Sequence, residues 1–172
     1  MTKISNSESD GSVGGDRRWT EFEIRVNDLG ATEVIELLSE HLGSLGAVSP
    51  PGSCHALNVD KLRAPGVTFW TVWDGDHLLG CGALKELDPG HGEVKSMRTA
   101  NAHLRRGAAS VVLEHIVGVA RRRGYKKLSL ETGAGGYFAA AHGLYKKFGF
   151  RDCAAFGDYR PDENSRFMTM EL

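Results

Sequence analysis

Apolar residues recur along the chain at two periods, and these periods divide it into alternating strands and helices. Apolar side chains spaced three to four residues apart predict amphipathic helices, since that spacing places them on one helix face. The predicted helices span Ala31–Leu45, Asn58–Arg63, Gly107–Arg123 and Phe138–Phe148. Gly124 and Gly149 stand just after the last two helices, where glycine commonly ends a helix.

Strands are predicted where β-branched and aromatic residues alternate with polar ones or form short apolar runs. The predicted strands span Trp19–Leu29, Val67–Trp73, His77–Leu87, Glu93–Thr99, Lys127–Thr132, Cys153–Tyr159 and Arg166–Leu172. An Asp-Gly turn at residues 74–76 joins the second and third strands as a hairpin. This order predicts an α/β (α+β) fold, in which a strand–helix–strand–helix–strand unit adds to a sheet of antiparallel strands.

The length and local composition predict the domain organisation. Residues 1–18 are rich in Ser, Gly, Asp and Lys and nearly lack large apolar groups, which predicts a disordered tail. Residues 19–172 are expected to form a single domain, because about 150 residues suffice to bury a hydrophobic core. No apolar run is long enough to span a membrane and no signal-peptide pattern is present, so a cytoplasmic protein is expected.

Composition argues against several classes of function. The formal net charge of −1 and the pI of about 6.7 argue against a nucleic-acid-binding protein, whose phosphate contacts require a basic excess. The three cysteines and seven histidines are scattered and match no zinc-ligand spacing, so no metal site is expected. Buried apolar roles in a reduced setting suit the cysteines best.

A helix start rich in hydrogen-bond donors is the first candidate site. The segment Arg105–Ser110 (RRGAAS) opens the third predicted helix with backbone N–H groups, a glycine and two guanidinium groups. Those groups together suit a pyrophosphate. The alternative, in which Gly107 only starts the helix and the arginines are solvated, remains open on this pattern alone.

A tyrosine on the fourth predicted helix is the second candidate. Ala141 and Tyr145 are four residues apart and share a helix face, beside an apolar stripe that contains Leu144 and Phe148. A tyrosine on the edge of such a stripe is usually part of the core, with its hydroxyl satisfied. The alternative is a phenol that faces a cleft and acts as a general acid.

Together, these two segments resemble the GNAT (Gcn5-related N-acetyltransferase) family. The cofactor motif of that family, Q/R-x-x-G-x-G/A after a splayed strand, corresponds to Leu104–Ala109. Its downstream motif, N-x-x-A-x-x-L-Y-x-x-x-G-F, corresponds to Phe138–Phe150. The resemblance covers roughly Phe22–Leu172 in element order. It implies a mixed, mostly antiparallel sheet of about seven strands, flanked by helices and splayed between the fourth and fifth strands.

The resemblance also implies a binding site for acetyl-CoA as cosubstrate. The residues that it assigns to this ligand are Met97, Arg98, Thr99, Arg105, Arg106, Gly107, Ala108, Ala109, Ser110 and Phe138. Two positions depart from the motifs: Leu104 stands at the first Gln/Arg place, and Phe138 replaces an asparagine that contacts the pantetheine arm. We expect these departures to alter the affinity for coenzyme A without abolishing binding, because backbone amides can still hold the pyrophosphate.

The implied reaction is direct transfer of an acetyl group from acetyl-CoA to an amine of a small molecule or peptide, in a ternary complex. Tyr145 is expected to protonate or hydrogen-bond the departing thiolate. An ammonium acceptor must first lose a proton, and Glu93 is the preferred base, with Glu131 or a chain of water molecules as alternatives. Ser53 and His55, in the loop after the first helix, and Glu131 are expected to contact the acceptor.

Two other interpretations compete with acetyl transfer. A dinucleotide-binding motif at Gly133–Gly136 is rejected, because Phe138 is too large for the close packing that the third glycine of that motif permits. A GNAT-like domain that binds acetyl-CoA without transferring the acetyl group, as a sensor or interaction module, stays open.

The acetyltransferase hypothesis also predicts further acceptor contacts and bears on the partners of the protein. The closing strands offer Asp158, Tyr159 and Arg160 as acceptor contacts. Neither a nucleic acid nor a membrane is expected as a partner, since the charge is near neutral and no spanning segment is present. A homodimer is compatible with the resemblance, since dimers are common in the family.

Overall fold

The computed structural model describes the backbone of residues 22–48 and 59–172 and the side chains of residues 22–40 and 59–172. The expected tail at residues 1–18, the start of the first predicted strand, and the acceptor-loop residues Ser53 and His55 lie outside the described residues. The strands are β1 (Glu23–Val26), β2 (Val67–Asp74), β3 (His77–Asp88), β4 (His91–Thr99), β5 (Lys127–Gly133), β6 (Arg151–Asp152) and β7 (Ser165–Glu171). The helices are α1 (Thr32–Val48), α2 (Val59–Leu62), α3 (Ala108–Arg122) and α4 (Ala139–Lys147), with short 3-10 turns η1 (Asn101–His103) and η2 (Gly136–Phe138).

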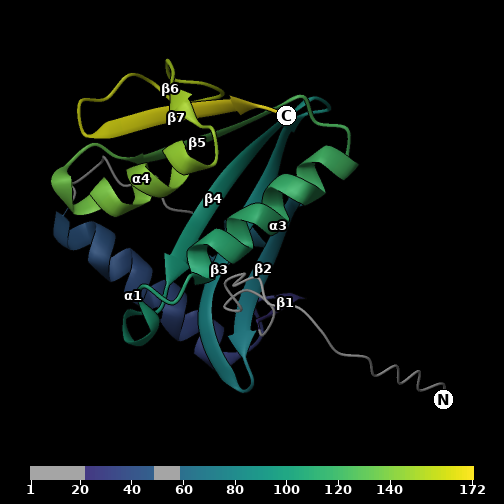
Figure 1. Cartoon of the computed structure of the whole chain (residues 1–172), viewed down its shortest axis with the longest axis vertical. Helices are drawn as coiled ribbons and strands as arrows, with labels where there is room; N and C mark the ends of the chain where they lie inside the picture. The colour runs from purple at the N-terminus through teal and green to yellow at the C-terminus, as the bar shows by residue number, and fades with distance from the viewer. Residues whose placement is uncertain (1–21, 49–58) are drawn as a thin grey trace, which may run out of the picture.

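Within the described residues the strands form one seven-stranded sheet with the order β1-β2-β3-β4-β5-β7-β6. All neighbouring strands are antiparallel except β4 and β5, which are parallel. A parallel pair requires a long crossover, and α3 supplies it across the face of the sheet that is turned to the viewer in Figure 1. The prediction of a mixed, mostly antiparallel sheet flanked by helices is confirmed.

Helices cover the central strands on both faces, which explains the unbroken run of buried residues in β2. Alternate residues of this strand point to opposite faces. Trp70 belongs to the buried cluster that includes Ile116 of α3, and Phe69 belongs to a second cluster that includes Leu37 of α1. Each buried side chain of this size contributes roughly 1.5–3 kcal/mol through the hydrophobic effect. The two clusters therefore clamp the central strands between α3 and α1.

The sheet opens between β4 and β5. Their parallel pairing covers only His91–Val94 of β4, after which β4 continues to Thr99 beside β3 alone. A bulge in the β3–β4 register near Ser96, whose φ is 53°, bends β4 at this point. The two strands separate visibly in Figure 1. The splay expected between the fourth and fifth strands is confirmed, and it leaves one edge of residues 95–99 without a strand partner in the described part of the chain.

The strand predicted over Cys153–Tyr159 is wrong. β6 has only two residues, and a loop follows it with a turn at Gly157, whose φ is 56°. The apolar residues that suggested a strand pack onto the sheet instead: the ring of Phe156 lies 5.2 Å from that of Tyr159, and both lie within 6.0 Å of Phe167 of β7. We call Cys153–Asn164 the β6–β7 loop, and these three aromatic rings anchor it to the sheet.

The remaining elements agree with the sequence patterns. The hairpin of β2 and β3, the short helix α2 and the helices α3 and α4 begin and end close to their predicted residues. None of the helices in residues 22–48 and 59–172 is both long and apolar enough to cross a membrane. The same residues contain no group of His, Cys, Asp or Glu side chains arranged to hold a metal ion.

Candidate active site

The amino-terminal end of α3 presents backbone donors beside the splay. Gly107 is the N-cap residue, with a φ of 92° that glycine adopts at little cost, and no side chain caps the helix there. Arg105 also has a positive φ, of 62°. The N–H groups at residues 108–110 begin the helix and therefore have no intrahelical acceptor. Together with the helix dipole they suit an anion, which is the chemistry expected of the segment Arg105–Ser110.

The two arginines of this segment have different surroundings. Arg106 donates to a carboxylate oxygen of Asp74 at the end of β2, and its guanidinium lies 5.7 Å from the ring centre of Phe22. An exposed ion pair of this kind is weak, so Arg106 can exchange its partner for another anion. Arg105 is exposed and forms no ion pair with any residue that the structure describes. The neighbouring Leu104, at the first Gln/Arg place of the motif, is 54% exposed.

Met97, Arg98 and Thr99 form the end of β4, beyond its pairing with β5. The Arg98 guanidinium donates to the carboxylate of Glu40 on α1 at 3.0 Å, so this side chain joins α1 to the sheet. Met97 lies over Gly82 of β3 on the α3 side, where an added Cβ would come within 2.7 Å of its sulfur. The side chains of Met97 and Arg98 thus have structural contacts, and the main chain of all three residues borders the splay.

Tyr145 of α4 is buried in the cluster on the α3 side of the sheet. Its side chain is 7% exposed and stacks edge-on against Phe150, with ring centres 5.8 Å apart. Burial raises the pKa of the phenol well above its ordinary value, and the negative charge of Glu131 on β5 adds to the rise. No hydrogen bond joins the hydroxyl to another described residue. Tyr145 is therefore both a core residue and a neutral phenol with an unused proton.

Glu93 lies on the opposite face of β4, inside a buried polar cluster. Its side chain is 3% exposed, and its Oε1 accepts hydrogen bonds from the Lys95 ammonium at 2.7 Å and from the Tyr159 hydroxyl at 2.6 Å. Lys95 also donates to the Tyr159 oxygen at 2.7 Å, so the three groups close a triangle. We call these residues the Lys95–Glu93–Tyr159 cluster. Burial and the neighbouring Glu93 carboxylate raise the pKa of Tyr159, which keeps it a neutral donor.

Glu131, the alternative base, lies on β5 past the point where β4 departs. It accepts a hydrogen bond from the Ser165 hydroxyl at 2.7 Å and stands opposite Phe167 of β7. Its charge contributes to the raised pKa values of both Tyr145 and Tyr159. The Glu131 carboxylate therefore lies at the open side of the sheet, close enough for its charge to act on both tyrosines.

Phe138 lies against the end of β5. The half-buried ring lies directly on Gly133, where a Cβ would overlap it, and Tyr137 stacks against its edge at 5.1 Å. The Gly133 carbonyl accepts a hydrogen bond from Nε2 of His142 on α4 at 2.7 Å, and Arg166 donates to Nδ1 of the same ring. The aromatic replacement at position 138 is thus accommodated by a glycine and fixed beside the end of β5.

Sequence patterns alone missed Lys95 and His142. Lys95 is two residues from Glu93, and such a spacing on a strand places both side chains on one face, so the signal was present once the strand was assigned. His142 on a short helix gave no comparable signal, because its partner Gly133 contributes only a backbone carbonyl.

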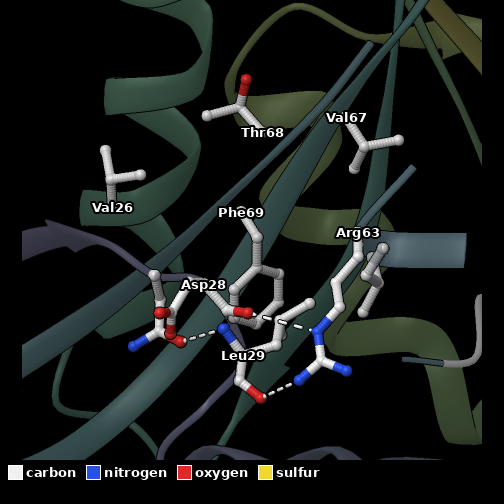
Figure 2. Close-up of a pocket in the computed structure, with 9 residues that line it drawn as sticks. Val26, Asp28, Leu29, Arg63, Val67, Thr68 and Phe69 are labelled. Atoms are coloured by element: carbon white, nitrogen blue, oxygen red, sulfur yellow. Dashed lines mark hydrogen bonds between the residues drawn. The ribbon is translucent and has the colours of Figure 1, made fainter. Parts of the chain in front are cut away.

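A pocket of about 260 Å³ lies elsewhere, between the end of β1, α2 and the start of β2. Figure 2 shows Arg63 at its edge, donating to the main-chain carbonyls of Asp28 at 3.3 Å and Leu29 at 2.7 Å. None of the site residues predicted from the sequence lines this pocket. Its donors are already paired with backbone, which indicates a structural role for Arg63.

Comparison with known proteins defines the class of this fold and site. The family model described as acetyltransferase (GNAT) family matches residues 33–150. The chain is 54% identical over 151 residues to the uncharacterized N-acetyltransferase YsnE of Bacillus subtilis strain 168, covering 88% of this chain and 100% of the relative. It is 53% identical to the uncharacterized N-acetyltransferase YedL of Escherichia coli K12, covering 88% of this chain and 95% of the relative.

A solved structure agrees at the level of the fold. A GNAT family acetyltransferase from Elizabethkingia anophelis, solved with acetyl-CoA bound, superposes with a TM-score of 0.62 at 19% identity, covering 89% of this chain and 99% of the other. Fold and sequence together define an acyltransferase. The chain belongs to the GNAT family of N-acetyltransferases.

Proposed function

We propose that the protein transfers the acetyl group of acetyl-CoA directly to an amine of a small molecule or peptide within a ternary complex. The observation that carries the proposal is the uncapped amino-terminal end of α3 beside the open edge of β4. The end of α3 is suited to a pyrophosphate, and the edge of β4 can form main-chain hydrogen bonds with an extended thioester arm. The Elizabethkingia relative, which was solved with acetyl-CoA bound, supports this choice of donor.

The residues present fit acetyl-CoA. The donor set at the start of α3 consists of backbone N–H groups, together with the guanidinium of Arg105, and all of these favour an anion. Arg106 can join them if it leaves Asp74. The main chain of Met97–Thr99 offers the unpaired strand edge, and Phe138 supplies an apolar surface at the end of β5. When bound, acetyl-CoA supplies the activated acetyl group.

The chain's own groups account for the protons of the reaction. A protonated amine must lose one proton before its nitrogen can attack, and Glu93 accepts that proton in our proposal. A C–N bond then forms and the C–S bond breaks, with release of a second nitrogen proton. Tyr145 donates its phenolic proton, or a hydrogen bond, to the departing sulfur and regains a proton from solvent. Its raised pKa keeps it protonated and able to donate.

Glu131 is the second candidate for the base. It already accepts a hydrogen bond from the Ser165 hydroxyl at 2.7 Å. Glu93 is preferred because its Oε2 accepts no hydrogen bond from any residue that the structure describes. Its second oxygen thus keeps its full capacity to accept.

The test is to incubate the protein with acetyl-CoA and a panel of amines that includes small amines, amino acids and peptides, while following release of free thiol. We expect acetyl-dependent thiol release with at least one amine, and a large loss of turnover in Glu93→Gln but not in Glu131→Gln. A protein that binds acetyl-CoA by calorimetry and releases no thiol above buffer with any amine would instead be a non-catalytic acetyl-CoA-binding module. The reverse ranking of the two glutamine variants would assign the base to Glu131.

A further inference from the structure

The Lys95–Glu93–Tyr159 cluster uses only one of the two oxygens of Glu93. Oε1 accepts both the Lys95 ammonium and the Tyr159 hydroxyl, at 2.7 and 2.6 Å. Oε2 accepts no hydrogen bond from the described residues. An ionised carboxylate has about four lone-pair sites, so two contacts on one oxygen leave the lone pairs of the other oxygen unused.

The lysine solves an energetic problem that a buried base faces. An isolated carboxylate taken out of water tends to become neutral, and a neutral carboxylic acid cannot accept the proton of an ammonium. Lys95 is itself 8% exposed and lies in direct contact with Glu93, so its charge compensates the carboxylate where solvent cannot. A buried pair of this kind is expensive and rarely adds to stability, which makes a role other than stability worth testing.

The loop that carries Tyr159 is held firmly against the sheet. The ring of Tyr159 packs 5.6 Å from Phe167 and 5.2 Å from Phe156, and the Lys95 ammonium lies 5.3 Å from the centre of the Tyr159 ring. These contacts fix the hydroxyl without requiring its hydrogen bond to Glu93. The hydroxyl therefore reaches Glu93 from a residue whose ring already packs on the sheet.

We propose that Lys95 and Tyr159 are positioning residues for Glu93, which hold its Oε1, place a positive charge against the carboxylate and leave Oε2 to accept the proton of the acceptor ammonium. This inference rests on the proposed function. Neither residue touches the reacting atoms: Lys95 acts through its charge and Tyr159 through its hydrogen bond. The proton taken up by Oε2 leaves to solvent before the next turnover.

Other ionisable groups also face this carboxylate and enter the test. They are Lys95 and His91 on β4, Lys85 opposite Glu93 on β3, Glu131 on β5, and Tyr159 on the β6–β7 loop. Lys85 makes no hydrogen bond or ion pair with Glu93, although it shares its face of the sheet. Lys85→Met is therefore the matched control for Lys95→Met, with the same change on the same face and without the contact.

The experiment compares the pH dependence of kcat, with one amine, in the wild type and in Lys95→Met, Lys95→Arg, Tyr159→Phe and Lys85→Met. Removing the adjacent positive charge favours the neutral carboxylic acid, so the acid limb of the Lys95→Met profile should move to higher pH by roughly 1 unit or more. Tyr159→Phe should move it in the same direction by less. Lys95→Arg should restore most of the wild-type profile, and Lys85→Met should leave it nearly unchanged.

A second readout does not depend on acetyl transfer. In protein labelled with ¹³C at the glutamate carboxyl carbons, the resonance missing in Glu93→Gln identifies Glu93, and its titration midpoint should rise in Lys95→Met. If Lys95→Met does not fold, Tyr159→Phe carries both measurements, with Lys95→Arg as the control that keeps the charge. Wild-type protein without activity towards any amine would refute the proposed function. Active wild type, with unchanged acid limbs and midpoints in the Lys95→Met and Tyr159→Phe variants, would refute the positioning role alone.

Discussion

Tyr145 combines two properties that a proton donor to a thiolate needs. It is a neutral phenol, since burial and the charge of Glu131 raise its pKa, and its proton is not used by another described residue. Tyr145→Phe should therefore lower turnover by roughly 10²-fold, within the usual range for a general acid. The affinity for acetyl-CoA and the thermal stability should change little, because phenylalanine keeps the ring that packs on Phe150.

The control for this variant is Tyr125→Phe. Tyr125 belongs to the same buried cluster, but its hydroxyl donates to Glu86 on β3 at 2.9 Å, away from the start of α3. Loss of the Tyr125 hydroxyl should lower the stability of the protein and leave kcat nearly unchanged. Equal kcat values for Tyr145→Phe and wild type, measured by thiol release at saturating substrates, would remove Tyr145 from the acid role.

Gly107 tests the anion site at the scale of one residue. Any residue that replaces Gly107 must adopt a backbone φ of 92°, which costs about 1 kcal/mol of stability for alanine. Gly107→Glu adds a negative charge to the same strain, and it should weaken acetyl-CoA binding roughly tenfold or more beyond Gly107→Ala. Calorimetric titration of both variants separates charge from strain. Equal affinities in the two would place the pyrophosphate elsewhere.

At the scale of elements, the contact between the end of β5 and η2 depends on one glycine. A Cβ at Gly133 would overlap the Phe138 ring, so Gly133→Ala should lower the free energy of unfolding by about 1–3 kcal/mol through overpacking. In the double variant with Phe138→Ala, this cost should largely disappear. Gly143→Ala, on the open surface of α4, should instead stabilise by about 0.5–1 kcal/mol, since alanine favours helix.

Urea unfolding of these variants gives the interaction energy between positions 133 and 138 directly. Additive effects of Gly133→Ala and Phe138→Ala would mean that the ring moves aside in solution. Phe138, which stands where the family motif has asparagine, would then pack on β5 without one fixed ring position.

The elements show how far sequence patterns reach. Helix and strand patterns locate α3 and α4, which each bury one face, and the β2–β3 hairpin, whose strands are largely buried on both faces. The pattern of Cys153–Tyr159 predicts a strand and is wrong, since Phe156 and Tyr159 bury their rings on the sheet without pairing their backbone. An apolar run predicts that its side chains are buried but does not predict their backbone geometry. Here the turn at Gly157 gives that backbone the geometry of a loop.

The candidate site shows the same limit. The start of α3 and the glutamate on β4 were predictable because each lies in a local pattern or at a family position. The contact between Glu93 and Tyr159 joins residues that are 66 positions apart, and no local period records it. Lys95 acquires its meaning only when that contact is known, because a lysine on a strand is ordinarily solvated.

For the whole molecule, the splay divides one sheet into two parts that are joined by little backbone pairing. β4 and β5 share only four register pairs, whereas β5 and β7 share seven. A ligand seated in the splay would contact the end of β4 and the start of α3 on one side, and β5 with η2 on the other. A ligand bound in the splay should therefore stabilise the contact between the two parts of the sheet.

Acetyl-CoA should consequently stabilise the protein and protect both sides of the splay from hydrogen exchange. A ligand at 100 times its Kd raises the free energy of unfolding by about 2.7 kcal/mol when only the folded state binds it. Slower exchange is expected at residues 97–99 and 108–110, and also at Gly133 and Phe138. Gly107→Glu at the same concentration should show less of both effects. Protection confined to the start of α3 would mean that the cosubstrate binds only through its phosphates, and the thioester arm would then have to lie outside the splay.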